Sequence, residues 1–307
     1  MHDELIGKQF GPDGRYLIRR HLGSGGSGHV YEAYEERKDR SVAVKFLSEG
    51  TDDAEVIRRF KLEGQKFSAI RHPNIVRVYG MGRAAGMLYI ASEFVDGENL
   101  WDFFRARGRL EIGEALQIID TVAGALEVAH DLGVIHRDLK PENVMIDREG
   151  VVKVLDFGIA KDLNASVALT IKGAYLGTAG YSAPEQIRGQ EIDARADIFS
   201  LGVMLYELVT GEPPFKGRRT TDVLENTVKA DPVNPTRFNE EVSSPVAKLI
   251  ARMIAKKKRA RMASCAEVRS EIAAVQAALG AGATQEDKKG IISFLKDVFD
   301  PDWAREG

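Results

Sequence analysis

Side chains suited to phosphoryl transfer are concentrated between His136 and Asn143. Asp138 is a candidate base, Lys140 is a cation, and the amide oxygen of Asn143 suits a hard metal ion. Thirteen residues after Asn143 comes Asp156, which opens an Asp-Phe-Gly tripeptide and could supply a second metal ligand. A base that holds an attacking hydroxyl, a cation and two metal ligands are what phosphoryl transfer requires. Turn chemistry explains any one of these residues, but not all of them in this order.

A glycine-rich run precedes these residues in the chain, from Gly23 to Gly28, with the spacing Gly-x-Gly-x-x-Gly. Strand-like sequence on both sides predicts a hairpin, whereas a dinucleotide-binding fold needs a helix directly after the glycines. A Walker loop would need Gly-Lys-Ser/Thr, which is missing here. The backbone amides of such a hairpin could approach nucleotide phosphates. Taken alone, the pattern fits a merely flexible hairpin equally well.

A lysine and a glutamate are predicted to form a pair across the first part of the chain. Lys45 ends a short apolar run, and strand alternation places it on the same face as Ala43. Glu63 lies between Phe60 and Phe67 on the apolar stripe of a predicted helix, where an unpaired carboxylate is costly. An ion pair that aims the Lys45 ammonium at phosphates would explain both residues. A solvent-exposed lysine is the alternative.

The elements that position these residues change in character along the chain. Strands are predicted at 16–22, 30–34, 42–46, 75–81 and 87–94, with one helix over 53–70. Beyond residue 97, predicted helices dominate. One ends at Gly133, another spans 198–209 and is apolar nearly all round, and strands at 134–135, 144–146 and 151–155 lie between them.

The pattern predicts an α+β fold in two lobes followed by a tail. The lobe over 1–95 holds an antiparallel β-sheet with one main helix, and the lobe over 96–278 is mostly helical. A linker and a short helical tail over 279–307 follow. The tail carries apolar residues on one predicted face, and nothing in the sequence decides whether it covers a groove, binds a partner or regulates the site.

Composition narrows the class of protein. Among 307 residues, 44% are hydrophobic, which is enough for a sizeable core, and the net charge of −3 gives no global attraction to nucleic acid or membranes. The single cysteine, Cys265, excludes an intramolecular disulfide and suits a reducing compartment. No window reaches the roughly 18 uninterrupted apolar residues of a membrane span. We therefore expect a cytoplasmic protein without a membrane span.

Together these motifs resemble those of the protein kinase superfamily, and more closely the bacterial Hanks-type (eukaryotic-like) serine/threonine kinases, over roughly residues 10–275. The ordered signatures are Gly23 to Val30, Val42 to Lys45, Glu63, His136 to Asn143, Asp156 to Gly158 and Ala183 to Glu185. The resemblance implies a bilobal protein kinase fold. It also implies transfer of the γ-phosphoryl group of ATP, with Mg²⁺ or Mn²⁺, to serine or threonine hydroxyls of protein substrates.

The resemblance further implies a role for each matching residue. The catalytic set is Asp138, Lys140, Lys45, Glu63 and Thr178, and the metal ligands are Asn143 and Asp156. The ATP-binding set is Leu22, Gly23, Ser24, Gly25, Gly26, Ser27, Gly28, Val30, Ala43, Lys45, Ser92, Glu93, Val95 and Met145. Within it, Ser92 is the gatekeeper, Glu93 and Val95 belong to the hinge, and Met145 covers the adenine ring.

Two sets of structural contacts are implied as well. Phe67, Val78, His136 and Phe157 correspond to an apolar spine that stacks only when helix and metal-binding motif are aligned; they are also ordinary core residues. Arg261 matches an arginine that pairs with Glu185. The basic run around Arg261, which by itself suggests nucleic-acid binding, is then a loop before the final helix, and no nucleic-acid partner is expected.

The resemblance also suggests a phosphorylation switch. Arg137 precedes Asp138, and in the family such an arginine pairs with a phosphorylated residue between the metal-binding and Ala-Pro-Glu motifs. Thr170 is the main candidate and Ser166 a weaker one, with self-association allowing one molecule to phosphorylate another. A passive loop is the alternative.

Rival classes are less well supported. A pseudokinase scaffold would have lost at least one of Lys45, Asp138, Asn143 or Asp156, and all are present. A small-molecule kinase would lack the segment around Thr178 and the Ala-Pro-Glu motif. The substrate, the upstream signal and the oligomeric state are not readable from the sequence.

Overall fold

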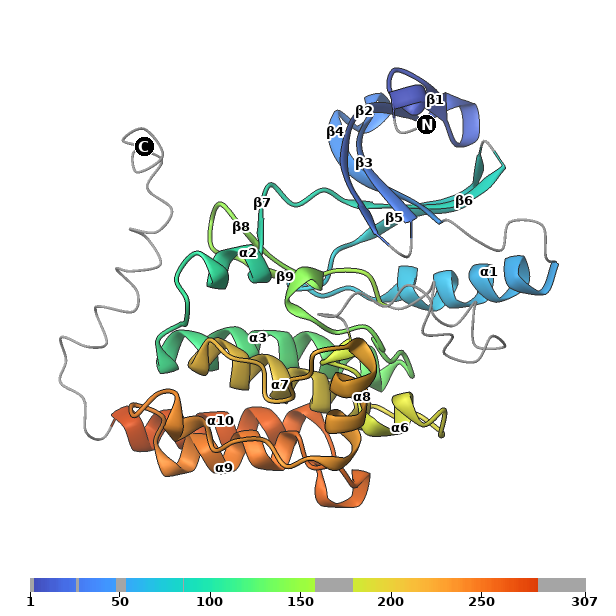
Figure 1. The fold of residues 1–307 in the computed structure, drawn as a ribbon. Helices are drawn as coiled ribbons and strands as arrows, with labels where there is room; N and C mark the ends of the chain where they lie inside the picture. The colour runs from blue at the N-terminus through green and yellow to red at the C-terminus, as the bar shows by residue number, and fades with distance from the viewer. Residues whose placement is uncertain (1–2, 26–27, 48–53, 85, 158–178, 281–307) are drawn as a thin grey trace.

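The computed structural model describes residues 3–25, 28–47, 54–84, 86–157 and 179–280. Figure 1 shows a curved β-sheet with one long helix in the upper part of the molecule and a bundle of helices in the lower part. The arrangement confirms the predicted α+β class and the bilobal protein kinase fold. The division at residue 95 stays a prediction.

The elements are grouped as expected, with strands first and helices later; η denotes a 3-10 helix. The first group is η1 (Asp3–Leu5), β1 (Gln9–Phe10), η2 (Pro12–Gly14), β2 (Tyr16–Gly25), β3 (Gly28–Glu35), η3 (Glu36–Lys38), β4 (Arg40–Leu47), α1 (Ala54–Ala69), β5 (Val78–Ala84) and β6 (Met87–Glu93). The second group is β7 (Gly97–Asn99), α2 (Leu100–Arg105), α3 (Ile112–Asp131), η4 (Pro141–Asn143), β8 (Val144–Asp147), β9 (Val152–Val154), α6 (Pro184–Ile187), α7 (Arg195–Thr210), α8 (Thr220–Lys229), η5 (Pro235–Arg237), α9 (Ser244–Met253), η6 (Lys258–Ala260) and α10 (Cys265–Gly280). The predicted strand at 134–135 is wrong, because these residues lie in irregular backbone.

The upper sheet has the strand order β1-β2-β3-β4-β6-β5, with every neighbouring pair antiparallel. Alternation along β4 is clean: Val42 and Val44 are buried in the sheet's own core, while Ala43 and Lys45 lie half-buried on the other face. The predicted placement of Lys45 with Ala43 is therefore confirmed. β4 is central in the sheet, so β3 and β6 pair with its two edges.

The edge strand β1 was not predicted from the sequence. Its aromatic residue Phe10 packs against Tyr16, Phe46 and Tyr89, with ring centroids 5.4, 5.2 and 5.0 Å away. Two residues are too few to show a strand period. The tertiary contacts of Phe10 therefore hold β1, rather than any local preference.

Helix α1 packs against β5 through an unusually close approach. A Cβ on Gly64 would lie 2.1 Å from Met81 Sδ, so a larger residue here would require the Met81 side chain to move. Phe60 and Phe67, on the predicted apolar stripe, are 2% and 5% exposed. The stripe therefore faces the interior as predicted.

Helix α7 forms the centre of the lower part of the molecule. Every residue from Ala196 to Thr210 is buried, as the all-round apolar sequence predicted. The helix ends at Gly211, whose φ of 73° is the left-handed conformation that glycine adopts readily. In the described part of the chain, no helix combines the length and apolar character needed to cross a membrane.

One buried carboxyl of α7 should make stability depend on pH. Glu207 accepts a hydrogen bond from Tyr181, and burial raises its pKa from 4.5 to about 7. The folded protein retains this proton up to about pH 7, whereas the unfolded chain releases it near 4.5. This contribution to the free energy of unfolding is therefore fully present below about pH 4.5 and is lost as pH rises through about 7.

We expect Glu207→Gln to remove that part of the pH dependence. The difference in unfolding free energy between Glu207→Gln and wild type is measured at two pH values. It should be about 1–3 kcal/mol more favourable to the variant at about pH 8 than at about pH 5. Urea unfolding at both pH values measures the difference. Glu225→Gln, on an exposed side chain that pairs with Lys229, is the control and should show none of it. Equal gains at both pH values would mean that Glu207 titrates normally.

Candidate active site

The loop between α3 and β8 is held by a carboxylate of α7. Asp197 Oδ2 accepts hydrogen bonds from the His136 backbone N–H and His130 Nε2, both at 2.8 Å, and Oδ1 accepts from the Arg137 N–H at 2.9 Å. Burial alone would raise the pKa of Asp197, but these donors hold it below its ordinary value. Asp197 therefore stays charged and fixes the backbone directly before Asp138.

Asp138 and Asn143 meet within this loop. Asn143 Nδ2 donates to the Asp138 carbonyl at 2.7 Å and lies 3.4 Å from Asp138 Oδ2. Pro141 opens η4 and thereby returns the chain from Asp138 to Asn143 within a single turn. The predicted base and the predicted metal ligand are thus neighbours, and Lys140 lies half-buried between them in the sequence.

Asp156 lies two residues beyond the end of β9 and forms an ion pair with Lys45 of the upper sheet. Its Oδ2 is 2.7 Å from Lys45 Nζ, which joins residues 111 positions apart. Asp156 and Arg137 have φ angles of 48° and 63°, in the left-handed region that non-glycine residues rarely adopt. Strained backbone of this kind concentrates at functional sites.

The predicted Lys45–Glu63 ion pair is wrong for this structure. Lys45 pairs with Asp156 instead, and Glu63 pairs with Lys66 on its own helix at 3.0 Å. Burial lowers the pKa of Arg137, and the negative charge of Glu63 opposes that shift. Glu63 therefore acts electrostatically on Arg137 while its ion pair is with Lys66.

The residues predicted to bind adenine come from facing strands. Ala43 of β4 is the cross-strand partner of Ser92 on β6, and Val30 of β3 is the partner of Lys45. Met145 lies on β8, beyond the connection between the lobes, opposite Asn99. The structure therefore places Val30, Ala43 and Ser92 on three adjacent strands of the upper sheet, and Met145 on the three-stranded sheet β7-β8-β9.

The glycine hairpin needs glycine at Gly28. This residue has a φ of 138°, and a Cβ there would lie 1.9 Å from the Phe46 carbonyl oxygen. Leu22 is exposed, as are Ser24 and Gly25. The hairpin therefore offers accessible backbone near its tip.

The predicted apolar spine is assembled. The Phe157 ring lies 4.9 Å from the Phe67 ring and 4.7 Å from the His136 ring, measured between centroids, and Val78 is 7% exposed. Burial lowers the pKa of His136, and its Nε2 donates to the Leu155 carbonyl at 2.8 Å. The neutral imidazole thus connects the loop that carries Asp138 to the residue directly before Asp156.

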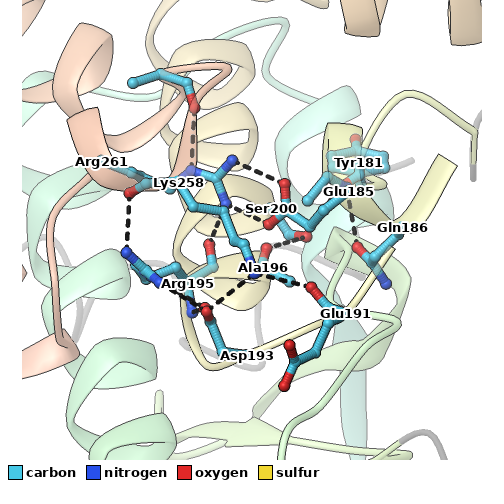
Figure 2. Close-up of polar contacts among 12 residues, drawn as sticks. Tyr181, Glu185, Gln186, Glu191, Asp193, Arg195, Ala196, Ser200, Lys258 and Arg261 are labelled. Atoms are coloured by element: carbon cyan, nitrogen blue, oxygen red, sulfur yellow. Dashed lines mark hydrogen bonds and ion pairs between the residues drawn. The ribbon is translucent and has the colours of Figure 1, made fainter. Parts of the chain in front are cut away.

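A buried ion pair ties the Ala-Pro-Glu motif to the last part of the lower lobe (Figure 2). Arg261 Nη1 and Nη2 lie 2.7 and 3.1 Å from the two Glu185 carboxylate oxygens, and both side chains are almost completely buried. Arg261 also donates to the carbonyls of Ala255 and Arg195. The predicted pair is confirmed.

Basic residues of the run before α10 bind other groups of the same chain. Lys258 binds the Glu191 carbonyl at 2.8 Å and the Asp193 carboxylate at 3.2 Å (Figure 2), while Lys256 donates to the Thr227 carbonyl at 2.7 Å. As predicted, the run lies directly before the final helix α10, and its residues 258–260 form the short helix η6.

Several predicted residues lie outside the described residues: Gly26 and Ser27 of the hairpin, Ser166 and Thr170 of the proposed switch, Thr178, and the tail beyond residue 280.

Asn143 and Asp156 suit a hard divalent cation. Because Asn143 Nδ2 is directed to Asp138, the amide is oriented to offer its oxygen to a cation. Within the described residues, no group of three or more His, Cys, Asp or Glu could hold a metal by itself. Two oxygen-bearing side chains completed by phosphate oxygens match the way Mg²⁺ and Mn²⁺ are bound beside nucleotides.

The sequence analysis missed three positioning residues. Asp197 holds the loop backbone, His130 Nε2 donates to the Asp197 carboxylate, and Gln186 Nε2 donates to the Arg137 carbonyl at 2.9 Å. The signal available was a charged residue opening an otherwise apolar, buried helix, since a buried charge requires partners.

Comparison with known proteins identifies the class to which this fold and site belong. The family model described as "Protein kinase domain" matches residues 16–271. The chain therefore belongs to the protein kinase domain family.

Two curated relatives show which branch it resembles. It is 40% identical over 263 residues to the serine/threonine-protein kinase PknB of Mycobacterium leprae, an alignment that covers 84% of this chain and 42% of the relative. It is also 40% identical over 253 residues to the serine/threonine-protein kinase PrkC of Bacillus subtilis, covering 82% and 39%. The chain thus spans about two fifths of the length of these relatives.

Proposed function

We propose that this protein is a serine/threonine protein kinase that transfers the γ-phosphoryl group of ATP to serine or threonine hydroxyls of protein substrates. The observation that carries the proposal is the convergence of distant residues on one site: Asp138 and Asn143 within one loop, and Asp156 paired with Lys45 from the other lobe. The relatives named as serine/threonine-protein kinases support the choice of acceptor.

Each side chain has a role in this chemistry. Asp138 accepts the proton of the acceptor hydroxyl and holds it in line, and Lys140 neutralises charge on the phosphoryl group in flight. Asn143 and Asp156 would hold Mg²⁺ or Mn²⁺, which supplies charge neutralisation between the phosphates. Lys45 would bind the α- and β-phosphates. Leu22, Val30, Ala43 and Met145 would enclose the adenine.

Substitution of Lys45 tests the nucleotide site. Lys45→Met should lower phosphoryl transfer by about 10²-fold, because one preorganised charge is lost from the phosphates while the fold is kept. Incorporation of labelled phosphate from ATP measures the rate. Lys229→Met removes a lysine from an exposed ion pair and is the matched control that should remain fully active. Full activity of Lys45→Met would show that Lys45 does not bind the phosphates.

We further propose autophosphorylation at Thr170, with Ser166 as a secondary acceptor and self-association as the means. Arg137 is the proposed binding partner of the new phosphate, and the charge of Glu63 currently acts on that arginine. Phosphorylation would give Arg137 a stronger anionic partner.

We expect mass spectrometry of the full chain incubated with ATP and magnesium to find phosphate on Thr170. Thr170→Ala should lower the rate toward an added protein substrate, because Arg137 then lacks its phosphate partner. Ser166→Ala is the comparison and should have a smaller effect. Phosphate found only outside residues 161–181 would reject the assignment.

A further inference from the structure

Two histidines lie side by side on the glycine-rich hairpin, on adjacent strands. Ser24 Oγ lies 2.9 Å from His21 Nε2 and 2.8 Å from His29 Nδ1. Ser24 and His29 are cross-strand partners, and the irregular register between His21 and Gly23 brings His21 toward the same point. The two imidazole rings are 6.3 Å apart between centroids.

This cluster is on the face of the hairpin opposite the proposed nucleotide. Along β3, His29 alternates with Val30, and the His21 ring packs edge-on against Tyr31 at 5.1 Å, so both histidines share the Tyr31 face. Tyr31 is buried, whereas Ser24 is exposed and both histidines are half-buried. A ligand can therefore reach the cluster from solvent without entering the nucleotide site.

The hydrogen bonds show that nitrogen atoms converge on one point. A serine hydroxyl has a single hydrogen to donate, so it donates to one imidazole nitrogen and accepts from the other. A change of tautomer turns both nitrogens into acceptors that face the same small volume. Nitrogen lone pairs of two histidines, with a hydroxyl beside them, are ligands that zinc-like ions prefer and that Mg²⁺ does not.

We propose that His21 and His29 form a binding site for a divalent transition-metal ion such as Zn²⁺, with Ser24 Oγ and water completing the coordination. Among the described residues, the site offers two strong ligands, His21 and His29, and we expect it to bind the ion reversibly. Its imidazole nitrogen ligands distinguish it from the oxygen site of Asn143 and Asp156.

Zinc titration of the nucleotide-free full chain, followed by calorimetry and by competition with a chromophoric chelator, tests the site. His2 lies outside the described residues, so every protein tested carries His2→Gln, including the reference protein called wild type in this experiment. Cys265 is buried and burial raises the pKa of its thiol, which keeps it out of competition. The expected result is one zinc ion per chain, bound at least about tenfold more weakly by His21→Gln and by His29→Gln.

Control variants keep the outcome clear. His72→Gln removes a histidine from another part of the fold and should bind zinc as wild type does. The double variant His21→Gln/His29→Gln should lose the stoichiometric site while keeping the wild-type melting temperature. Zinc affinity unchanged in both single variants, or no stoichiometric binding by wild type, would overturn the proposal.

A consequence for nucleotide binding rests on the proposed kinase function. An ion that joins β2 to β3 stiffens the hairpin that is proposed to cover the phosphates. With magnesium in excess and free zinc buffered, zinc should change the affinity for a non-hydrolysable ATP analogue at least about threefold in wild type and not in the double variant. Zinc binding without this change would overturn the coupling alone, and failure of every variant to bind the analogue would instead count against the kinase function.

Discussion

Replacement of Asp138 by Asn is expected to lower the rate of phosphoryl transfer by about 10²–10⁴-fold, the range that a positioned general base contributes. The amide cannot accept the proton of the acceptor hydroxyl. The fold should survive, because the Asp138 carbonyl still accepts the Asn143 Nδ2 hydrogen bond and the backbone on either side is held by Asp197. The rate is measured with labelled ATP and a serine- or threonine-containing protein substrate.

The control for this variant is Asp131→Asn, on an exposed residue at the end of α3, which should leave the rate unchanged. Binding of MgATP to Asp138→Asn should persist, since Lys45 and Asp156 are untouched. A wild-type protein that binds nucleotide but transfers no phosphoryl group would instead favour a pseudokinase scaffold. Undiminished transfer by Asp138→Asn would show that Asp138 is not the base.

The second large effect is expected at the buried Glu185–Arg261 pair. Glu185→Gln should cost about 3–5 kcal/mol of unfolding free energy, because it leaves the Arg261 charge buried without its counterion. Arg261 is completely buried at its side chain and keeps only carbonyl acceptors in that variant. Urea unfolding measures the loss, and Arg261→Met should show a loss of similar size.

Two comparisons separate this effect from ordinary loss of a contact. Arg252→Met breaks exposed ion pairs with Glu267 and Glu271 and should cost no more than about 1 kcal/mol. The double variant Glu185→Gln/Arg261→Met should be more stable than the sum of the single losses predicts, because neither charge is then left unpaired. Additive losses in the double variant would show that the two residues act independently.

Patterns that repeat along the chain predicted most of the fold. The alternation around Lys45, the stripe containing Phe60 and Phe67 and the all-apolar helix α7 each extend over several residues, and each was confirmed. Strand β1 was missed because its stability comes from the aromatic contacts of Phe10, which are distant in sequence.

The candidate site was predictable where a motif is contiguous, and less so where partners must be chosen across space. Asp138 and Asn143 share one loop, and the structure brings them together. Lys45 had two possible carboxylate partners, and sequence spacing cannot measure which way α1 presents Glu63. The position of Asp197 in an apolar helix signals that it needs partners, but the backbone amides that it binds cannot be identified from side-chain types in the sequence.

The Lys45–Asp156 ion pair also has a thermodynamic consequence. In this structure the lysine compensates the charge of the carboxylate that is expected to ligate metal. A nucleotide that draws the ammonium toward its phosphates removes that compensation, and a divalent cation restores it. Metal and nucleotide should therefore bind with positive cooperativity, each raising the affinity for the other by the same factor. Because Lys45 and Asp156 would each have to leave the other for a ligand, neither the nucleotide nor the cation would bind efficiently alone.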